Sequence, residues 1–238
     1  MQIKGRKALV FGGTSGIGLA VVQRLAEAGA TVIALSRSSA NIEAAQSVVP
    51  DSVRLASVDV LDREALAQVF ADNAPFDILV NAATGGERAL GPFLSMDLDG
   101  FQGSFRKLWG YTNTVRIGTE HMTEDGAIVL VSGSPARKCG PGAIALSTVG
   151  NAVEGFVRGV APELAPRRIN VVAPGVIDTP MFQMPADAKT AFFEQATSKN
   201  LIPRAGSANE VAQAIMFVIT NDFVTGTTVD VDGGALLP

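Results

Sequence analysis

The sequence predicts an α/β fold in which a parallel sheet lies between two layers of helices, as a doubly wound three-layer sandwich. Apolar runs of strand length alternate with helix-length segments along the chain, a pattern typical of parallel sheets. The first run is continuously apolar, as expected for a strand buried on both faces. The chain has 238 residues, 47% of them hydrophobic, which suits one sizeable core. We therefore expect a single domain over residues 1–238 with a mostly or fully parallel, seven-stranded sheet.

The expected elements follow one another in a regular order. Residues 8–11 form a compact apolar strand that ends at two glycines, and residues 16–28 carry apolar side chains at helical spacing before Gly29. Further strands are expected at 31–35, 53–58, 77–80, 127–131, 168–172 and 227–231. Helices are expected from about 62, at 98–122, at 147–164, and from Ser207, which matches a capping box with Glu210. The least regular stretch, 180–203, is either a lid over a substrate or an ordinary surface excursion.

Composition and charge exclude several classes of protein. The formal net charge is -4 and basic residues form no cluster, so no nucleic-acid partner is expected. No apolar stretch is long enough to span a bilayer and the N-terminus lacks the apolar region of a signal peptide, which predicts a cytoplasmic protein without a membrane partner. A single cysteine, Cys139, and a single histidine, His121, cannot make a zinc site of the usual kind, so no metal is expected.

A glycine-rich turn joins the first strand to the first helix and has the sequence GGTSGIG over residues 12–18. Glycines let the backbone turn tightly and approach a pyrophosphate, while the N–H groups of the following helix face the phosphates. Its position between a strand and a helix indicates a Rossmann-type site for a dinucleotide. The cofactor-binding residues expected in this turn are Gly12, Thr14, Ser15, Gly16, Ile17 and Gly18.

The spacing of these glycines, G-x-x-x-G-x-G, resembles that of the short-chain dehydrogenase/reductase family, and four further segments resemble the family in the same order. Asp59 and Val60 are similar to its adenine-contacting segment, and VDGG at 231–234 is similar to its C-terminal motif. Two other segments resemble its N-N-A-G motif and the P-G segment that touches the nicotinamide and the phosphates. By this resemblance, these two segments contribute the cofactor-binding residues Asn81, Ala82, Ala83, Pro174, Gly175, Ile177 and Thr179.

The end of the second expected strand predicts which dinucleotide is bound. Enzymes that use NAD place a carboxylate here to accept a hydrogen bond from the ribose 2′-hydroxyl. This chain has Ser36, Arg37 and Ser38 there, with no Asp or Glu between Ala28 and Ile42. Because a guanidinium pairs with a phosphate through two parallel hydrogen bonds, the sequence favours NADP(H) over NAD(H). The alternative is that Arg37 is an ordinary solvated arginine.

The resemblance also implies a catalytic set that this sequence lacks. Family members carry a Tyr-x-x-x-Lys pair after the fifth strand, a Ser near that strand and an Asn on the preceding helix, which act in acid–base catalysis. Alignment on residues 152–155 places Leu146 and Gly150 at the Tyr and Lys positions. The Ser and Asn positions fall on Gly133 and near Leu108. The usual proton relay of the family therefore cannot operate here.

Three nearby residues are candidate substitutes for the missing groups. Lys107 and Tyr111 lie one helical turn apart, so both can face the same side of their helix. Ser134 follows the fifth strand, next to one of the lost positions. Each has a simpler interpretation, since Tyr111 can be a core or interface aromatic and the others can be ordinary polar residues. The sequence therefore leaves the catalytic residues unknown.

The cofactor motif is complete, whereas the catalytic positions have changed. Two main functions are compatible with this combination. The first is an NADP(H)-dependent oxidoreductase with a non-standard site that reduces a carbonyl or alkene, or oxidises an alcohol, in a small-molecule substrate. The alternative is a non-catalytic NADP(H)-binding protein, acting as a sensor or as the partner subunit of an active relative in a mixed oligomer. Elimination or isomerisation on the same fold is a third option. Family members are commonly dimers or tetramers, so a homo-oligomer is expected.

Overall fold

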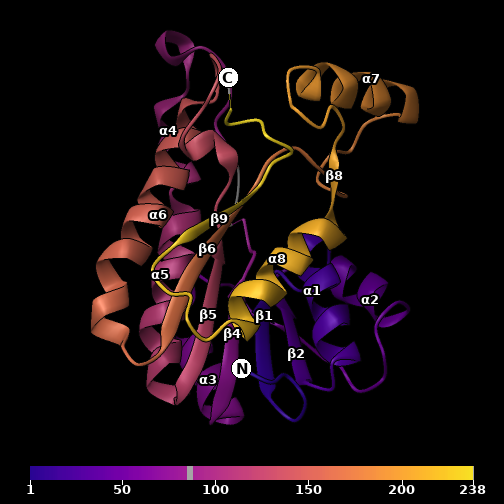
Figure 1. The fold of residues 1–238 in the computed structure, drawn as a ribbon. Coiled ribbons are helices and arrows are strands. Elements are labelled where there is room, and N and C mark those ends of the chain that lie inside the picture. The colour runs from indigo at the N-terminus through magenta and orange to yellow at the C-terminus, as the bar shows by residue number, and fades with distance from the viewer. Residues whose placement is uncertain (85–87, 238) are drawn as a thin grey trace.

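A sheet in which every pair of neighbouring strands is parallel forms the centre of the computed structural model, which describes residues 1–84 and 88–237 (Figure 1). Its strands are β1 (Lys7–Phe11), β2 (Thr31–Ser36), β3 (Arg54–Ser57), β4 (Phe76–Asn81), β5 (Met122–Val131), β6 (Arg168–Pro174) and β9 (Thr228–Val231). They lie in the order β3-β2-β1-β4-β5-β6-β9. This arrangement confirms the predicted fold class and the predicted seven-stranded parallel sheet.

Helices cover both faces of the sheet and complete the three layers (Figure 1). One face is covered by α1 (Gly16–Glu27), α2 (Ser39–Gln46) and α8 (Ala208–Thr220). The other face is covered by α3 (Arg63–Asn73), α5 (Arg106–Gly118) and α6 (Ile144–Leu164). The remaining elements are α4 (Leu98–Ser104), α7 (Ala186–Thr197), the paired short strands β7 (Ile177–Asp178) and β8 (Gly206–Ser207), and the 3-10 turns η1 (Phe93–Ser95), η2 (Thr119–His121) and η3 (Ser134–Ala136). The capping box of Ser207 and Glu210 opens α8 as predicted.

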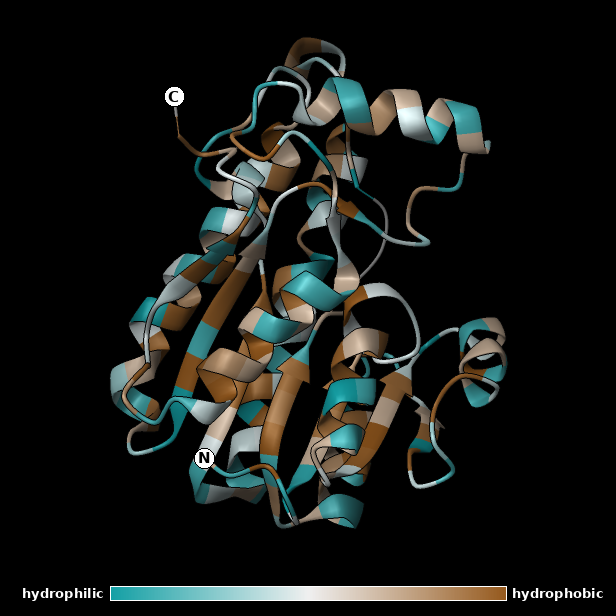
Figure 2. Ribbon diagram, turned by 45° about the vertical axis from the view of Figure 1, so that its right-hand side comes forward, coloured by the Kyte–Doolittle hydropathy of each residue, from teal (hydrophilic) through white to brown (hydrophobic). Residues whose placement is uncertain are grey.

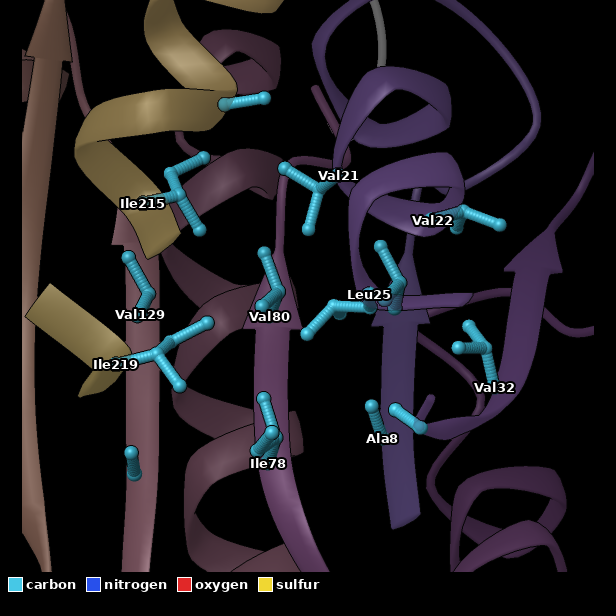
Figure 3. Close-up of a cluster of buried hydrophobic side chains, with 14 of the residues drawn as sticks. Ala8, Val21, Val22, Leu25, Val32, Ile78, Val80, Val129, Ile215 and Ile219 are labelled. Atoms are coloured by element: carbon cyan, nitrogen blue, oxygen red, sulfur yellow. The ribbon is translucent and has the colours of Figure 1, made fainter. Parts of the chain in front are cut away.

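Successive residues of the strands pack into two separate hydrophobic cores, one under each helical layer. In β1, Ala8 faces the layer that contains α1 and α8, whereas Leu9 faces the layer of α3, α5 and α6. Figure 3 shows Leu25 of α1 and Ile219 of α8 against strands that include Ile78 of β4. Complete burial of a side chain of this size contributes about 1.5–3 kcal/mol. Because both faces of the central strands are buried, these strands contain long hydrophobic runs (Figure 2).

The continuous helix expected over residues 98–122 is wrong. The structure has two helices, α4 and α5, which meet at Phe105, and the chain then passes through η2 into β5. Gly100 and Gly103 lower the helix propensity of α4. The hydroxyl of Ser104 donates to the Gly100 carbonyl, a type of interaction that bends helices. The periodicity of the apolar residues did not reveal this interruption.

The stretch described above as the least regular, residues 180–203, contains the regular helix α7, which stands away from the sheet (Figure 1). The ring of Phe193 packs edge-on against Phe182, with 5.2 Å between the ring centroids. Lys189 forms an ion pair with Asp178 of β7, with 2.5 Å between Nζ and Oδ1. Among the 12 residues of α7 only one is buried. The helix therefore lacks the apolar stripe by which a core helix is recognised in a sequence.

Candidate functional site

The segments expected to bind the cofactor converge at the carboxyl ends of β1, β4 and β6. The strand order reverses between β1 and β4, and ligands of such sheets bind at this switch point. The Ala82 amide donates to the carbonyl of the last β1 residue over 2.9 Å. A Cβ placed on Gly12 would lie 2.8 Å from the Ala83 nitrogen, and one on Gly16 would lie 3.4 Å from Cβ of Thr179. The turn after β1 thus lies against both other segments.

The turn between β1 and α1 has the backbone that a diphosphate requires. Gly12 and Gly16 have φ angles of +71° and +51°, in the left-handed region that favours glycine. A Cβ on Gly18 would lie 2.0 Å from the Gly12 carbonyl oxygen, so only glycine permits α1 to pack this closely. Ser15 is the N-cap residue of α1, and among the described residues its side chain makes no capping hydrogen bond. The N–H groups and positive end of α1 therefore fit a pyrophosphate.

The residues expected to select the dinucleotide lie at the end of β2, beside the segment that follows β3. The Arg37 guanidinium lies 3.2 Å from a carboxylate oxygen of Asp59, and the Arg37 side chain is 61% exposed. The Ser36 hydroxyl accepts a hydrogen bond from the Ser38 amide. The Ser38 hydroxyl in turn accepts from the Asn41 amide as the N-cap of α2. A phosphate at this point would meet a guanidinium and the positive end of a helix.

Asn81 fixes the backbone at the end of β4. It is fully buried, and its Nδ2 donates to the Thr114 hydroxyl over 2.9 Å. Its Oδ1 accepts from the Ala83 amide over 3.0 Å. Both polar groups of the Asn81 side chain are therefore used within the fold, and they hold Ala82 and Ala83 beside the glycine turn.

A cavity of about 180 Å³ opens beside this turn. The residues expected to bind cofactor that also line the cavity are Ile17, Ala82, Pro174, Gly175, Ile177 and Thr179. Further walls come from the end of β5, from the first turns of α6, and from Met181 and Phe182 in the segment before α7. Among the described lining residues there is no tyrosine, histidine, aspartate or glutamate. The cavity is therefore largely apolar, with few groups that can exchange a proton.

Gly150, which the sequence alignment places at the family's lysine position, lines the cavity where η3 packs against α6. A Cβ on Gly150 would lie 2.8 Å from Cβ of Ala136 and 3.3 Å from the Ser132 hydroxyl oxygen. The Ser132 hydroxyl donates to the Gly150 carbonyl over 3.3 Å, and Asn151 donates to the Ala136 carbonyl. A larger side chain at position 150 would therefore displace η3. Ala136 and Ser132 thus occupy the space that the first side-chain atoms of a lysine at position 150 would need.

The other three residues that the sequence alignment places at catalytic positions of the family, Gly133, Leu146 and Leu108, have no side-chain group that can transfer a proton. Leu146 presents an aliphatic side chain to the cavity. Gly133 also lines the cavity, and a Cβ there would lie 3.4 Å from Pro135, which is ordinary contact. Leu108 is half-buried and packs against the core between the sheet and α3, α5 and α6. The described cavity lining does not include it.

Lys107 brings a cation from α5 into the cavity. Its side chain is half-buried, and its Nζ donates to the Ser132 carbonyl over 3.2 Å, beside the end of β5. The Nζ also lies 5.5 Å from the centre of the Tyr111 ring, so the two residues share a helix face as predicted. Burial, and secondly the positive charge of Arg88, lower the pKa of the Lys107 ammonium to about 7. Lys107 therefore exchanges a proton near neutral pH.

Tyr111 and Ser134 are placed differently. The Tyr111 hydroxyl is buried and donates to the Val131 carbonyl over 2.9 Å, and burial raises the pKa of this hydroxyl above its ordinary value. Ser134 is buried at the start of η3. Neither belongs to the described lining of the cavity. Their geometry fits a structural role for both.

Several residues that line the cavity were not predicted individually as site residues. Arg88 and Ser104 are marked by no motif, and Met181 and Phe182 were covered only by the suggestion of a lid over residues 180–203. Only the contact between distant segments brings them to one cavity. Over residues 1–84 and 88–237, no group of three or more metal-ligating side chains is found. In the same residues, no helix combines the length and apolar character that a bilayer span requires.

The parallel sheet and the glycine turn at its switch point define a Rossmann-type domain of the dinucleotide-binding class. The family model described as Enoyl-(Acyl carrier protein) reductase matches residues 12–235. The chain therefore belongs to the short-chain dehydrogenase/reductase family of oxidoreductases.

Three relatives illustrate this membership. L-xylulose reductase of Bos taurus is 30% identical over 249 residues, covering 99% of this chain and 98% of its own length. The 3-oxoacyl-(acyl-carrier-protein) reductase FabG of Thermotoga maritima is 32% identical over 252 residues, covering 100% of both chains. A crystal structure of a small-chain dehydrogenase in complex with NADPH is 27% identical and has a TM-score of 0.82, covering 99% of this chain and 100% of that chain. At least one solved relative of this chain thus binds NADPH.

Proposed function

We propose that this chain is an NADP(H)-dependent oxidoreductase that reduces a carbonyl or an activated alkene, or oxidises the corresponding alcohol, without the Ser-Tyr-Lys set. The observation that carries this proposal is a glycine turn suited to a diphosphate beside a cavity whose family positions are Gly133, Leu146 and Gly150. When bound, NADPH supplies a hydride. The glycine turn of the chain binds the phosphates, and the apolar cavity excludes water around a small-molecule substrate.

The preference for NADP(H) over NAD(H) is supported by the end of β2. The end of β2 adjoins the glycine turn, since the Gly12 and Gly13 amides donate to the Leu35 carbonyl, and Arg37 and the N-terminus of α2 follow directly. In the free protein the guanidinium faces Asp59, and a 2′-phosphate would compete with that carboxylate for it. The NADPH-bound relative points the same way.

Purified protein tests both parts of the proposal. Calorimetric titration with NADPH and NADH gives the two dissociation constants, and NADPH oxidation is then followed with a panel of ketones, aldehydes and activated alkenes. Tighter binding of NADPH, with turnover above the protein-free rate, is the expected result. Absence of binding by either dinucleotide contradicts the proposal entirely.

A second function is favoured by the absence of Tyr, His, Asp and Glu from the described lining of the cavity. A chain that binds NADP(H) without turnover would act as a sensor or as the partner of an active relative. Tight binding of NADPH without turnover on the whole panel, together with copurification of a related subunit, is the outcome that favours it. Steady turnover by the protein alone removes it.

Three further features belong to the proposal. Segment 180–203 acts as a lid, since Met181 and Phe182 line the cavity and α7 stands clear of the sheet.

The chain forms a homo-oligomer, a dimer or a tetramer, because Leu98 and Trp109 of the adjoining helices α4 and α5 are 69% and 55% exposed. Light scattering after size exclusion measures the mass of the assembly. The exposed Cys139 fits a reducing compartment such as the cytoplasm.

A further inference from the structure

Without the family's catalytic set, the cavity needs another proton donor for a reduction. Lys107 lines this cavity and carries an amine that can serve. Its side chain starts on α5, not on α6 where the family's lysine belongs, and reaches the end of β5 to donate to the Ser132 carbonyl over 3.2 Å. It lines the same cavity as Gly133, Leu146 and Gly150. An amine therefore lies at the floor of the cavity although position 150 is closed by Ala136.

The other polar groups in the described lining are poorer proton donors. The Ser132 and Ser104 hydroxyls donate to the carbonyls of Gly150 and Gly100, over 3.3 and 2.9 Å. Thr84 and Thr179 carry alcohols, which do not ionise near neutral pH. The Arg88 guanidinium keeps its proton under these conditions. Lys107 is left as the lining group that can both hold and release a proton at physiological pH.

The charged surroundings of Lys107 explain why its proton is mobile. Arg88, from the segment before α4, is the charged neighbour, and its positive charge disfavours a second cation. Tyr111 lies one turn along α5 and stays neutral because burial raises its pKa. Burial is the larger effect on Lys107 and, together with Arg88, brings the pKa of its ammonium to about 7. A general acid is most effective when its pKa lies near the working pH.

We propose that Lys107 is the general acid of the reduction, a role that rests on the oxidoreductase function proposed above. A carbonyl carbon that accepts the hydride of NADPH gains one C–H bond. The electron pair of the C=O π bond moves to oxygen, which takes a proton from Nζ of Lys107. One N–H bond breaks and one O–H bond forms, so the carbonyl is reduced to an alcohol and NADPH is oxidised to NADP⁺. The neutral amine of Lys107 then regains its proton from water.

Two substitutions at one position separate proton transfer from charge. Lys107→Met removes the proton donor and keeps a similar length, whereas Lys107→Arg keeps the charge but holds its proton near neutral pH. Lys199→Met is the matched control, because Lys199 is exposed on the segment after α7. We expect Lys107→Met to lower kcat by about 10²- to 10⁴-fold while the Kd for NADPH stays within about twofold. Lys107→Arg does not restore kcat, and Lys199→Met leaves it unchanged.

The pH dependence of kcat and the titration of the Lys107 amine distinguish a proton donor from a residue with a purely structural role. The kcat of the wild-type protein falls above pH 7, and this dependence is absent from the residual activity of Lys107→Met. NMR of isotopically labelled lysines in the free protein shows one amine that titrates near pH 7, missing in Lys107→Met and present in Lys199→Met. Restoration of kcat by Lys107→Arg, or titration of every lysine above pH 10, overturns the role of Lys107.

Failure of this inference is distinguishable from failure of the proposed function. If the wild-type protein turns over no substrate, the oxidoreductase function fails and the role of Lys107 fails with it. If the wild-type protein is active and Lys107→Met has the same kcat and pH profile, the role of Lys107 alone is overturned.

Discussion

The glycine turn after β1 and the floor of the cavity at the end of β5 lie beside each other but are built differently. The turn is made of backbone, with Gly12 and Gly16 at positive φ and Gly18 packed on a carbonyl. The chemistry of the floor depends on side chains, and the positions predicted for the family's catalytic groups hold Leu146 and Gly150 there. A backbone site tolerates almost no change because it is part of the fold. A side-chain site can lose its chemistry while the sheet and helices stay in place.

The largest expected effect comes from breaking the backbone site. Gly18→Val places a Cβ 2.0 Å from the position of the Gly12 carbonyl oxygen and forces the turn open. We expect the affinity for NADPH to fall by on the order of 100-fold, about 2.8 kcal/mol, in a fluorescence titration. Gly159→Ala on α6 is the control, because a Cβ there meets nothing within 4 Å. Circular dichroism verifies that both variants fold, and unchanged affinity in folded Gly18→Val would contradict the assignment of the phosphate site.

The next effect sharpens the cofactor preference. Arg37→Ala removes the guanidinium at the end of β2, and a hydrogen bond to a charged group contributes about 1.5–3 kcal/mol. We therefore expect NADPH to bind about 10- to 100-fold more weakly, with little change for NADH, in parallel calorimetric titrations. Arg116→Ala, on an exposed part of α5, serves as the control. Equal losses for both dinucleotides would show that Arg37 does not recognise the 2′-phosphate.

A third prediction tests whether the floor is closed to the family's lysine. Gly150→Lys forces Cβ to within 2.8 Å of Ala136, and overpacking of this kind costs about 1–3 kcal/mol. Chemical denaturation measures the loss in the free energy of unfolding. Adding Ala136→Gly to Gly150→Lys removes the nearest atom and recovers part of that loss. A stable Gly150→Lys single variant would mean that η3 moves aside easily.

The smallest expected effect is on the pH dependence of stability. The pKa of Lys107 is lowered to about 7 in the folded protein, so the unfolded chain binds more protons between pH 7 and the ordinary lysine pKa of 10.5. The stability contributed by this residue therefore rises with pH across that window, and it is lost as the pH falls from about 10.5 to about 7.

Lys107→Met removes this dependence. The variant is expected to exceed the wild-type protein in stability by about 1 kcal/mol at pH 6, or about 2–4 °C in Tm. The advantage shrinks as the pH approaches 10. Thermal unfolding at a series of pH values measures the difference, and a constant difference across the series would show that Lys107 is not desolvated.

Much of the fold was predictable because local patterns reflect it directly. Buried parallel strands leave continuous apolar runs, and the capping box at Ser207 marks the start of α8. The break at Phe105 and the helix α7 were missed, because a back-bonded serine and a helix with one buried residue leave no periodic signal. Arg88 and Ser104 were missed as lining residues for a different reason. Long-range packing brings them to the cavity, and no local pattern records it.

By itself, the sequence determined the parallel α/β fold and the glycine turn, and it predicts the loss of the family's proton relay. Each of these depends on residue types within a short segment, whose conformational and chemical limits are intrinsic. Only the tertiary structure decided that Ala136 fills the space at Gly150, that Tyr111 is bonded to a strand carbonyl, and that Lys107 reaches the cavity. These outcomes depend on how α5, η3 and α6 pack against the ends of distant strands. The pKa of a lysine likewise follows from the groups packed around it.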